Sequence, residues 1–240
     1  MQQSGFLAPP VAPEAPAAPA FPDLVTVDAF GAALMLIGLF VVSFLIGSIP
    51  WGVIISRIFF SKDIRSEGSG NIGATNAART LGKKGAAAVF LLDFGKGLVS
   101  GWLGLQCAFH LGEFQATLAS VAMALSFLGV ILGHVFSPWL GFKGGKGISA
   151  AFGNLFFLVG PIGALAELAL FIIVVAVSRY VSAGSIAAAV AAPFVALCFY
   201  WGQWIAIAIV AIAALVVIWA HRGNIQRLRA GTEHRIGGRK

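Results

Sequence analysis

Long apolar runs separated by short polar segments occupy most of the chain from residue 29 onward. The first run is interrupted by Gly47-Ser48-Ile49-Pro50, a sequence that breaks a helix. The runs cover about 29–60, 84–109, 115–137, 148–178, 182–200 and 203–220. Because about 20 apolar residues of helix cross the hydrocarbon core of a bilayer, the pattern predicts an all-α integral membrane protein.

The number of spans depends on the stretch 148–178, which contains Gly160-Pro161. It could form one tilted helix, or the proline could end one helix and begin another. Charge favours the second reading. Apart from Lys96, the 16 Lys and Arg residues fall in five clusters, at 57–65, 79–84, 143–146, 179 and 222–240.

With a break at Gly160-Pro161 the chain has seven spans, and all five basic clusters lie on one side of the membrane. Without the break, Arg179 and the basic C-terminal segment change sides. Cytoplasmic loops carry an excess of Lys and Arg. The charge pattern therefore predicts a seven-transmembrane-helix bundle with its N-terminus outside and its C-terminus in the cytoplasm.

Composition supports the membrane prediction. Hydrophobic residues make up 59% of the chain and charged residues only 10%, whereas soluble domains carry about 25% charged residues. The net charge of +7 fits cytoplasmic loops and anionic headgroups, and we expect no nucleic acid partner. Cys107 and Cys198 lie in apolar runs, and no CxxC or HxxxH spacing exists. We therefore expect no disulfide, metal or cofactor.

Residues 1–28 differ from the rest, since Ala and Pro dominate them. They predict a disordered tail. The stretch is unlike a signal peptide because it has no basic segment ahead of an apolar core. Residues 29–240 are predicted to form one membrane domain.

The first polar segment with candidate chemistry runs from Gly68 to Arg79. Its glycines let backbone N–H groups approach an anion, and an arginine can clamp a phosphate with two parallel hydrogen bonds. The alternative is a flexible loop with a basic membrane anchor. The candidate ligand-binding residues are Ser69, Gly70, Asn71, Gly73, Thr75, Asn76 and Arg79.

The second segment ends in Phe-Lys-Gly-Gly-Lys-Gly and opens directly into an apolar helix. Glycines and lysines ahead of a helix suit a phosphate group, although the segment lacks the Walker A pattern. The alternative is a basic loop between spans. The candidates are Lys143, Gly144, Gly145, Lys146 and Gly147, and His134 just before them is either a satisfied polar residue or a functional one.

The third segment, 221–233, follows the last apolar run. His221 and Asn224 are three residues apart and so share one helix face. For Arg222, Arg227 and Arg229 we expect anchoring to headgroups. A polar turn at 179–185 adds Ser182 and Ser185 on the same side.

Two spans contain acidic residues. Asp93 and Lys96, three residues apart, are predicted to form an intrahelical ion pair near the bundle interior, because charges within the bilayer tend to pair. Glu167 has no partner in the sequence pattern, and no role is predicted for it.

In their order and spacing, the three segments resemble the bacterial acyl-phosphate-dependent glycerol-3-phosphate acyltransferases (PlsY-type). Gly47-Ser48-Ile49-Pro50 and Leu92–Gly97 are further matches, and the resemblance covers about 34–236. It implies acyl transfer from acyl-phosphate to the 1-position of glycerol 3-phosphate, giving lysophosphatidic acid and phosphate for phospholipid biosynthesis. It also implies seven spans in the bacterial inner membrane, an active site facing the cytoplasm, and no use of acyl-CoA.

By this resemblance, five residues are candidate catalytic groups: Ser69, Arg79, Lys146, His221 and Asn224. The other glycines and polar residues of the first two segments would bind substrate phosphates, together with Ser185, which is preferred over Ser182, and Glu233. The expected partners are glycerol 3-phosphate, acyl-phosphate and membrane lipid, with the protein a monomer. The His-x-x-x-x-Asp motif of other acyltransferases is absent.

Acyl-phosphate is a mixed anhydride with a good leaving group, so no acyl-enzyme is required. Catalysis would come from holding two anionic reactants together. Either a substrate phosphate or His221 could accept the hydroxyl proton, and the resemblance favours the phosphate. A phosphate-ester transporter and a lipid-binding scaffold are the alternative classes. The absence of an inverted repeat argues against transport.

Overall fold

The computed structural model describes residues 28–112 and 115–237, so the predicted tail lies outside the described residues except for Asp28. Within these ranges all regular secondary structure is helical. The helices are α1 Ala29–Ser48, α2 Trp51–Phe60, α3 Ala74–Thr80, α4 Gly82–Gly112, α5 Ala116–Val135, the 3₁₀ turn η1 Pro138–Leu140, α6 Ile148–Leu158, α7 Gly160–Ser178, α8 Val181–Phe199, α9 Trp204–Ala220 and α10 Arg222–Arg229.

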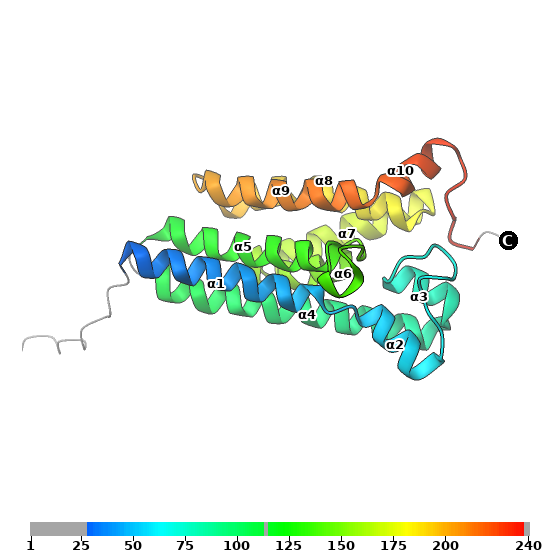
Figure 1. Cartoon of the computed structure of the whole chain (residues 1–240). Coiled ribbons are helices and arrows are strands. Elements are labelled where there is room, and N and C mark those ends of the chain that lie inside the picture. Colours follow the sequence, from blue (N-terminus) through cyan, green and yellow to red (C-terminus); the bar gives the residue numbers. More distant parts are fainter. Residues whose placement is uncertain (1–27, 113–114, 238–240) are drawn as a thin grey trace, which may run out of the picture.

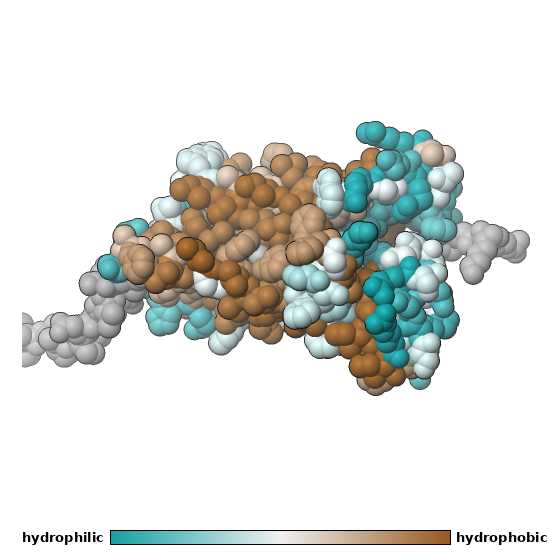
Figure 2. All heavy atoms as spheres, in the orientation of Figure 1, coloured by the Kyte–Doolittle hydropathy of each residue, from teal (hydrophilic) through white to brown (hydrophobic). Residues whose placement is uncertain are grey.

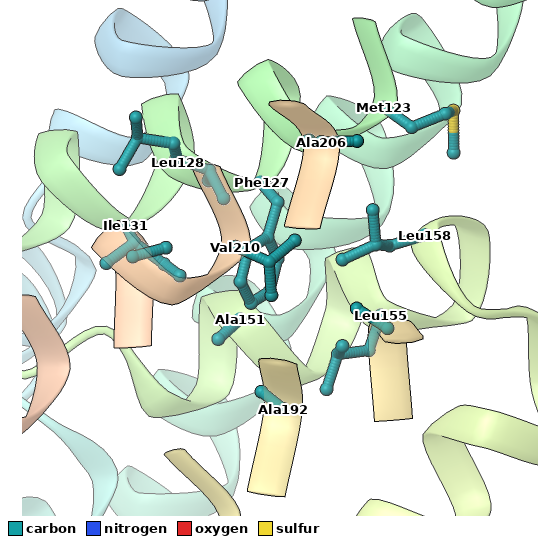
Figure 3. Close-up of a cluster of buried hydrophobic side chains, with 14 of the residues drawn as sticks. Met123, Phe127, Leu128, Ile131, Ala151, Leu155, Leu158, Ala192, Ala206 and Val210 are labelled. Carbon is teal, nitrogen blue, oxygen red and sulfur yellow. The ribbon is translucent and has the colours of Figure 1, made fainter. Parts of the chain in front are cut away.

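The long helices lie side by side in one bundle (Figure 1). Helix α5 packs against α1, α4, α6 and α9, while α7 and α8 pack against each other and α8 against α9. Side chains from α5, α6, α8 and α9 fill the centre, where Phe127, Ile131, Leu155 and Val210 meet (Figure 3). Helix α5 is therefore the axis around which the other helices are arranged.

Small residues let α1 and α5 approach at backbone distance. A Cβ atom added at Gly133 would lie 2.0 Å from the Phe44 carbonyl oxygen, and one at Gly47 would lie 2.3 Å from the Val130 carbonyl oxygen. Such contacts between small residues are the usual way in which helices associate in lipid. The Gly47-Ser48 pair therefore serves helix packing at the end of α1.

The outer surface of the bundle is apolar along most of its length, and polar side chains gather at one end (Figure 2). Large hydrophobic side chains such as Ile37, Ile173 and Val177 are exposed on the sides of the long helices. That end contains α2, α3, α10 and the loops that join the long helices to them (Figure 1). The described part of the chain therefore has a lipid-facing belt and one strongly polar end.

Among the described residues, five helical stretches are long and apolar enough to cross a membrane, and α9 counts as a sixth when it is taken together with α10, from which it bends by 56°. The predicted break is present. Helix α6 ends at Leu158, and α7 begins at Gly160, which has a positive φ of 68°, followed by Pro161.

Helix α6 has only 11 residues, and its shortness has a visible cause. The segment after η1 folds back along α5, where Gly144 N–H donates to the Val135 carbonyl and Gly145 N–H to the His134 carbonyl, both at 3.0 Å. Gly147 lies beside Ile131. This returning segment therefore covers part of the depth that a full-length helix would cross, and α6 begins inside the bundle.

Candidate active site at the polar end

The three predicted segments meet around one cavity of about 190 Å³ at the polar end of the bundle. The turn before α8 contributes to its wall as well. Twelve of the residues predicted from the sequence line this cavity: Ser69, Asn71, Gly73, Thr75, Asn76, Arg79, Lys146, Gly147, Ser185, His221, Asn224 and Glu233. Gly70, Lys143, Gly144 and Gly145 are not among the lining residues.

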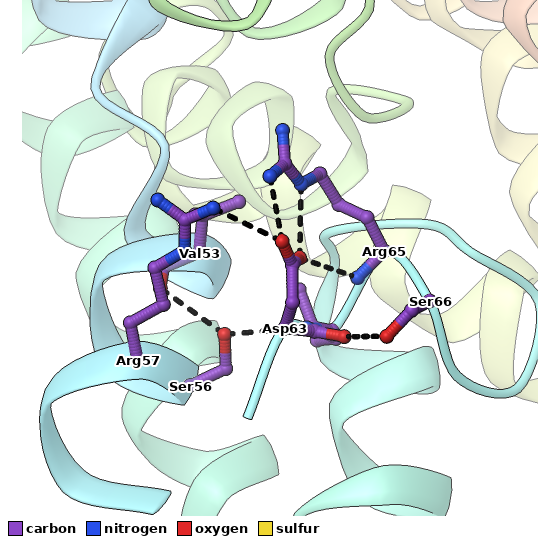
Figure 4. A network of polar contacts seen from close by, with 7 residues as sticks. Val53, Ser56, Arg57, Asp63, Arg65 and Ser66 are labelled. Carbon is purple, nitrogen blue, oxygen red and sulfur yellow. Dashed lines mark hydrogen bonds and ion pairs between the residues drawn. The ribbon is translucent and has the colours of Figure 1, made fainter. Parts of the chain in front are cut away.

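The turn after α2, which leads into the first segment, is held by a network of polar contacts around Asp63 (Figure 4). Asp63 accepts hydrogen bonds from the Arg65 side chain at 2.6 and 2.9 Å and from Arg57 at 3.0 Å. The bonds from Arg65, and then that from Arg57, hold the pKa of Asp63 well below its usual range. Ser56 accepts from the Ile64 N–H at 3.4 Å. This turn reverses the chain and sends it toward α3.

Asn76 holds the first segment in shape. Its amide nitrogen donates to the Ile64 and Glu67 carbonyl oxygens at 3.0 and 3.1 Å, and its amide oxygen accepts from the Ser69 N–H at 2.8 Å. Both polar atoms are therefore occupied, and the side chain is buried. These hydrogen bonds close the loop, and the binding of a ligand by Asn76, which lines the cavity, stays a prediction. Arg79 forms no ion pair with any described residue.

The glycines of the second segment permit its close contact with α5. A Cβ atom at Gly145 would lie 2.1 Å from Nε2 of His134, and one at Gly144 would lie 2.0 Å from the His134 carbonyl oxygen. Lys143 is exposed. Of the two lysines in this segment, Lys146 is therefore the one that lines the cavity.

Lys146 donates a hydrogen bond to the amide oxygen of Asn224, which joins the second and third segments. Burial lowers the pKa of Lys146 to about 8. The negative charge of Glu233 opposes this shift, whereas the positive charges of Arg227 and Arg79 add to it. The ammonium group is consequently poised to gain from a bound anion.

Glu233 joins three side chains of the site. Its carboxylate accepts from Asn224 at 2.7 Å, from Arg227 at 2.7 Å and from Ser182 at 3.0 Å. Burial alone would raise the pKa of Glu233, but these three hydrogen bonds hold it below its usual value. The carboxylate is therefore ionised, and it fixes the orientation of Asn224 toward Lys146.

One sequence interpretation needs correction here. Arg227, expected to anchor headgroups, instead lines the cavity and pairs with Glu233. Ser182 and Ser185 both line the cavity. The Ser182 hydroxyl belongs to the network around Glu233, and the Ser185 hydroxyl donates to the Val181 carbonyl within its own helix. Arg222 differs from Arg227, because its guanidinium lies over the Trp219 ring at 3.9 Å.

The tautomer of His221 follows from its hydrogen bond. Its Nδ1 lies 2.8 Å from the Val217 carbonyl oxygen, which can only accept, so in the neutral ring Nδ1 carries the proton. Nε2 then presents a lone pair. His221 lines the cavity, and this nitrogen can accept a hydrogen bond from a bound hydroxyl.

A buried ion pair lies at the inner wall of the cavity. Lys96 Nζ is 2.7 Å from Asp93 Oδ1, as the spacing predicts, and it also donates to the Ile49 carbonyl at 3.0 Å. His134 Nδ1 lies 3.6 Å from the same carboxylate oxygen. Asp93 and His134 line the cavity, which sequence reasoning had left open. The cluster links α4 to α5 and to the break between α1 and α2.

An apolar cavity of about 140 Å³ adjoins the polar one. Phe90, Ile148, Ser149 and Phe171 line both cavities. Almost all other lining groups of the apolar cavity are hydrocarbon, with Glu167 as the exception. A ligand with a charged head and an apolar tail can therefore occupy both spaces at once.

Comparison with known proteins identifies the family. The family model described as glycerol-3-phosphate acyltransferase matches residues 37–231. The chain belongs to the glycerol-3-phosphate acyltransferase family. A relative of that name from Geobacter sulfurreducens is 45% identical over 196 residues, covering 81% of this chain and 94% of the relative. One from Synechococcus sp. is 41% identical over 199 residues, covering 83% and 94%.

Solved structures agree with the family assignment. The glycerol 3-phosphate form of PlsY (YgiH), an integral membrane glycerol 3-phosphate acyltransferase, superposes with a TM-score of 0.71 at 34% identity. The match covers 84% of this chain and 96% of that one. The lysophosphatidic acid form gives a TM-score of 0.69 at 33% identity. This acyltransferase is thus an integral membrane protein of the PlsY type, and its described part is helical.

Proposed function

We propose that this acyltransferase moves a fatty acyl group from acyl-phosphate to the sn-1 hydroxyl of glycerol 3-phosphate. The products would be lysophosphatidic acid and inorganic phosphate. The observation that carries the proposal is the pair of adjoining cavities, one lined by cations and hydrogen-bonding groups and the other by hydrocarbon. Glycerol 3-phosphate suits the first, and the chain of the acyl donor suits the second.

Two phosphate groups must be held near each other, and the site supplies the positive charge for this. Arg79 and Lys146 line the cavity from different segments, and Arg227 lies beside them with its charge balanced by Glu233. An arginine without an ion-pair partner can bind phosphate through two parallel hydrogen bonds. Binding both anions offsets their mutual repulsion and brings the hydroxyl to the acyl carbon.

In the chemical step the hydroxyl oxygen attacks the acyl carbonyl carbon, and the bond from that carbon to the phosphate oxygen breaks. The hydroxyl proton passes to a phosphate oxygen, since a phosphate monoester has a second pKa near 6. His221 accepts a hydrogen bond through Nε2 and orients the hydroxyl. Protonating His221 instead would add a buried cation beside Lys146. No covalent acyl-enzyme forms, and Ser69 acts as a hydrogen-bond donor.

The polar end would face the cytoplasm of a bacterium, with the protein in the inner membrane as a monomer. The chain would cross the bilayer seven times, with its N-terminus outside. Helix α6 would complete one of these crossings together with the segment 144–147 that precedes it. The hydrogen bond from the Tyr200 hydroxyl to the Leu158 carbonyl supports this topology, because it joins the end of α6 to the turn between α8 and α9. Thiol labelling of single-cysteine variants at Lys143 and Gln203 in intact cells tests the sidedness.

The direct test is an assay of the purified protein with acyl-phosphate and glycerol 3-phosphate, with lysophosphatidic acid as the readout. Arg79→Ala and Lys146→Ala should abolish transfer while the proteins remain folded. Lys143→Ala is the matched control, because Lys143 is exposed and does not line the cavity. Efficient use of acyl-CoA would reject the donor assignment. Counterflow of glycerol 3-phosphate in proteoliposomes without a lipid product would indicate transport instead.

A further inference from the structure

Asp93 places a carboxylate in the wall of a cavity that otherwise suits anions. It belongs to α4, is only 1% exposed, and lines the polar cavity. Glu233 is the other carboxylate among the described lining residues. A negative charge in this place would repel a phosphate group unless it were compensated, so its presence calls for an explanation.

Lys96 supplies the compensating charge. Its Nζ lies 2.7 Å from Asp93 Oδ1, and His134 Nδ1 lies 3.6 Å from the same oxygen. The pair of Asp93 and Lys96 is neutral as a whole, so an anion can bind beside it. No described residue donates a hydrogen bond to the second carboxylate oxygen, Oδ2. Asp93 therefore keeps an unused acceptor while it lines the cavity.

An ionised carboxylate can only accept hydrogen bonds, so the ligand group that faces Asp93 must be a donor. Of the two proposed substrates, ionised acyl-phosphate has no hydrogen-bond donor, whereas glycerol 3-phosphate has two hydroxyls. His221 offers Nε2 to the hydroxyl that attacks, and the Glu233 carboxylate already accepts three hydrogen bonds. The sn-2 hydroxyl needs an acceptor of its own, and Asp93 is available for it.

The two acceptors reach the cavity from different helices. Asp93 lies within α4, and His221 follows the last residue of α9. Both helices pack against α5 and lie apart from each other (Figure 1). The two hydroxyls of a glycerol unit are on adjacent carbon atoms and can point to two such groups at the same time.

We propose that Asp93 binds the sn-2 hydroxyl of glycerol 3-phosphate and thereby selects it over phosphates that lack a donor at that carbon. A site built to bond a substrate hydroxyl rejects an analogue without it, because the buried polar group of the site is then left unpaired. A keto group at that carbon is also rejected, since its oxygen only accepts. This inference rests on the proposed acyl transfer, because it assigns the substrate selectivity of the same site.

The experiment compares three phosphates as recipients of the acyl group from acyl-phosphate. They are glycerol 3-phosphate, 3-hydroxypropyl phosphate, which lacks only the sn-2 hydroxyl, and dihydroxyacetone phosphate, which has a keto group in its place. In the wild type, kcat/KM should be at least about tenfold lower for each analogue than for glycerol 3-phosphate, the effect of leaving one buried acceptor unpaired.

The test variant combines Asp93→Asn with Lys96→Met, so that no lysine is left buried and unpaired. Its discrimination against 3-hydroxypropyl phosphate should shrink to about threefold or less. Dihydroxyacetone phosphate should gain most, because an amide can donate to the keto oxygen. Ser100→Ala is the matched control and should keep the wild-type ratios. Ser100 is buried on the same helix, donates to the Ser126 carbonyl and does not line the cavity.

Thermal unfolding in detergent shows that each variant is folded, and calorimetric Kd values of the three phosphates replace kcat/KM where turnover is too slow. A wild type that uses 3-hydroxypropyl phosphate as efficiently as glycerol 3-phosphate would overturn the inference. A folded double variant with the wild-type ratios would do the same, since Asp93 would then not contact the sn-2 hydroxyl. If the wild type made no lysophosphatidic acid from any acyl-phosphate, the proposed function itself would fail.

Discussion

Glu233 should set the protonation of Lys146 and thereby the alkaline limit of activity. The carboxylate supports the ammonium group through its negative charge, and Asn224 bonds to both side chains. Replacing Glu233 by Gln removes that charge and keeps the size of the side chain. The pKa of Lys146 should then fall further below its value of about 8.

The size of the effect follows from the interaction of the two charges. A charge a few Å away in a partly solvated site is worth about 1.4 kcal/mol or more, which corresponds to one pKa unit. With a shift of about one unit, the charged fraction of Lys146 at about pH 8 falls from roughly one half to one tenth. Near pH 6.5 it changes by less than about a third. The kcat/KM of Glu233→Gln should accordingly drop about fourfold more at pH 8 than at pH 6.5.

The assay is the pH dependence of kcat/KM, which reports groups of the free enzyme. Wild-type activity should decline as the pH rises through about 8, because Lys146 loses its proton. Arg227→Gln is the opposite perturbation, since Arg227 lowers the pKa of Lys146, and it should move the decline to higher pH. A change that only displaced Asn224 or Lys146 would lower kcat/KM by the same factor at every pH. An alkaline midpoint that stays in place in both variants would refute the assignment of Lys146 as the titrating cation.

Two further predictions concern the framework of the site. Gly145→Ala places a Cβ atom 2.1 Å from Nε2 of His134, so the segment that carries Lys146 must shift. Transfer activity should fall about 100-fold because the positioning of Lys146 is lost. Gly95→Ala is the control and should stay active, since nothing lies within 4 Å of its added Cβ. Asp93→Asn should lower the free energy of unfolding by about 3–5 kcal/mol, since it leaves Lys96 buried and unpaired. Adding Lys96→Met should restore much of that stability, and unfolding in detergent measures both; equal stability of the single and double variants would contradict the pairing.

Much of the architecture could be predicted from the sequence, because the length of an apolar run indicates a membrane helix and the positions of basic residues indicate which ends lie together. The break at Gly160-Pro161 and the concentration of basic residues at one end both followed from local chemistry. The depth at which α6 begins could not be predicted from the sequence. It depends on backbone hydrogen bonds between residues 144–145 and 134–135, and such a pairing leaves no periodic trace in the sequence.

The sequence also did not show that residues of the same type make different contacts. Arg222 and Arg227 lie on the same short helix, yet one stacks on Trp219 and the other pairs with Glu233. The difference depends on how the chain turns after α10, which brings Glu233 back to that helix. Asn76 was likewise identified as a polar residue of the site, but only the folded loop shows that both of its polar atoms are already occupied.

The segment 144–147, which returns along α5, has a consequence for how the enzyme would tell its proposed acyl-phosphate donor from the surrounding bilayer. Because Gly147 lies beside Ile131, more than one helical turn before the end of α5, the backbone next to Lys146 is recessed below the end of that helix. In a phospholipid, a glycerol unit separates the phosphate from the acyl carbonyls and holds it farther out. In the proposed acyl-phosphate donor the two groups are directly bonded, so its phosphate would sit deeper than the phosphate of an ordinary phospholipid and closer to this recessed backbone.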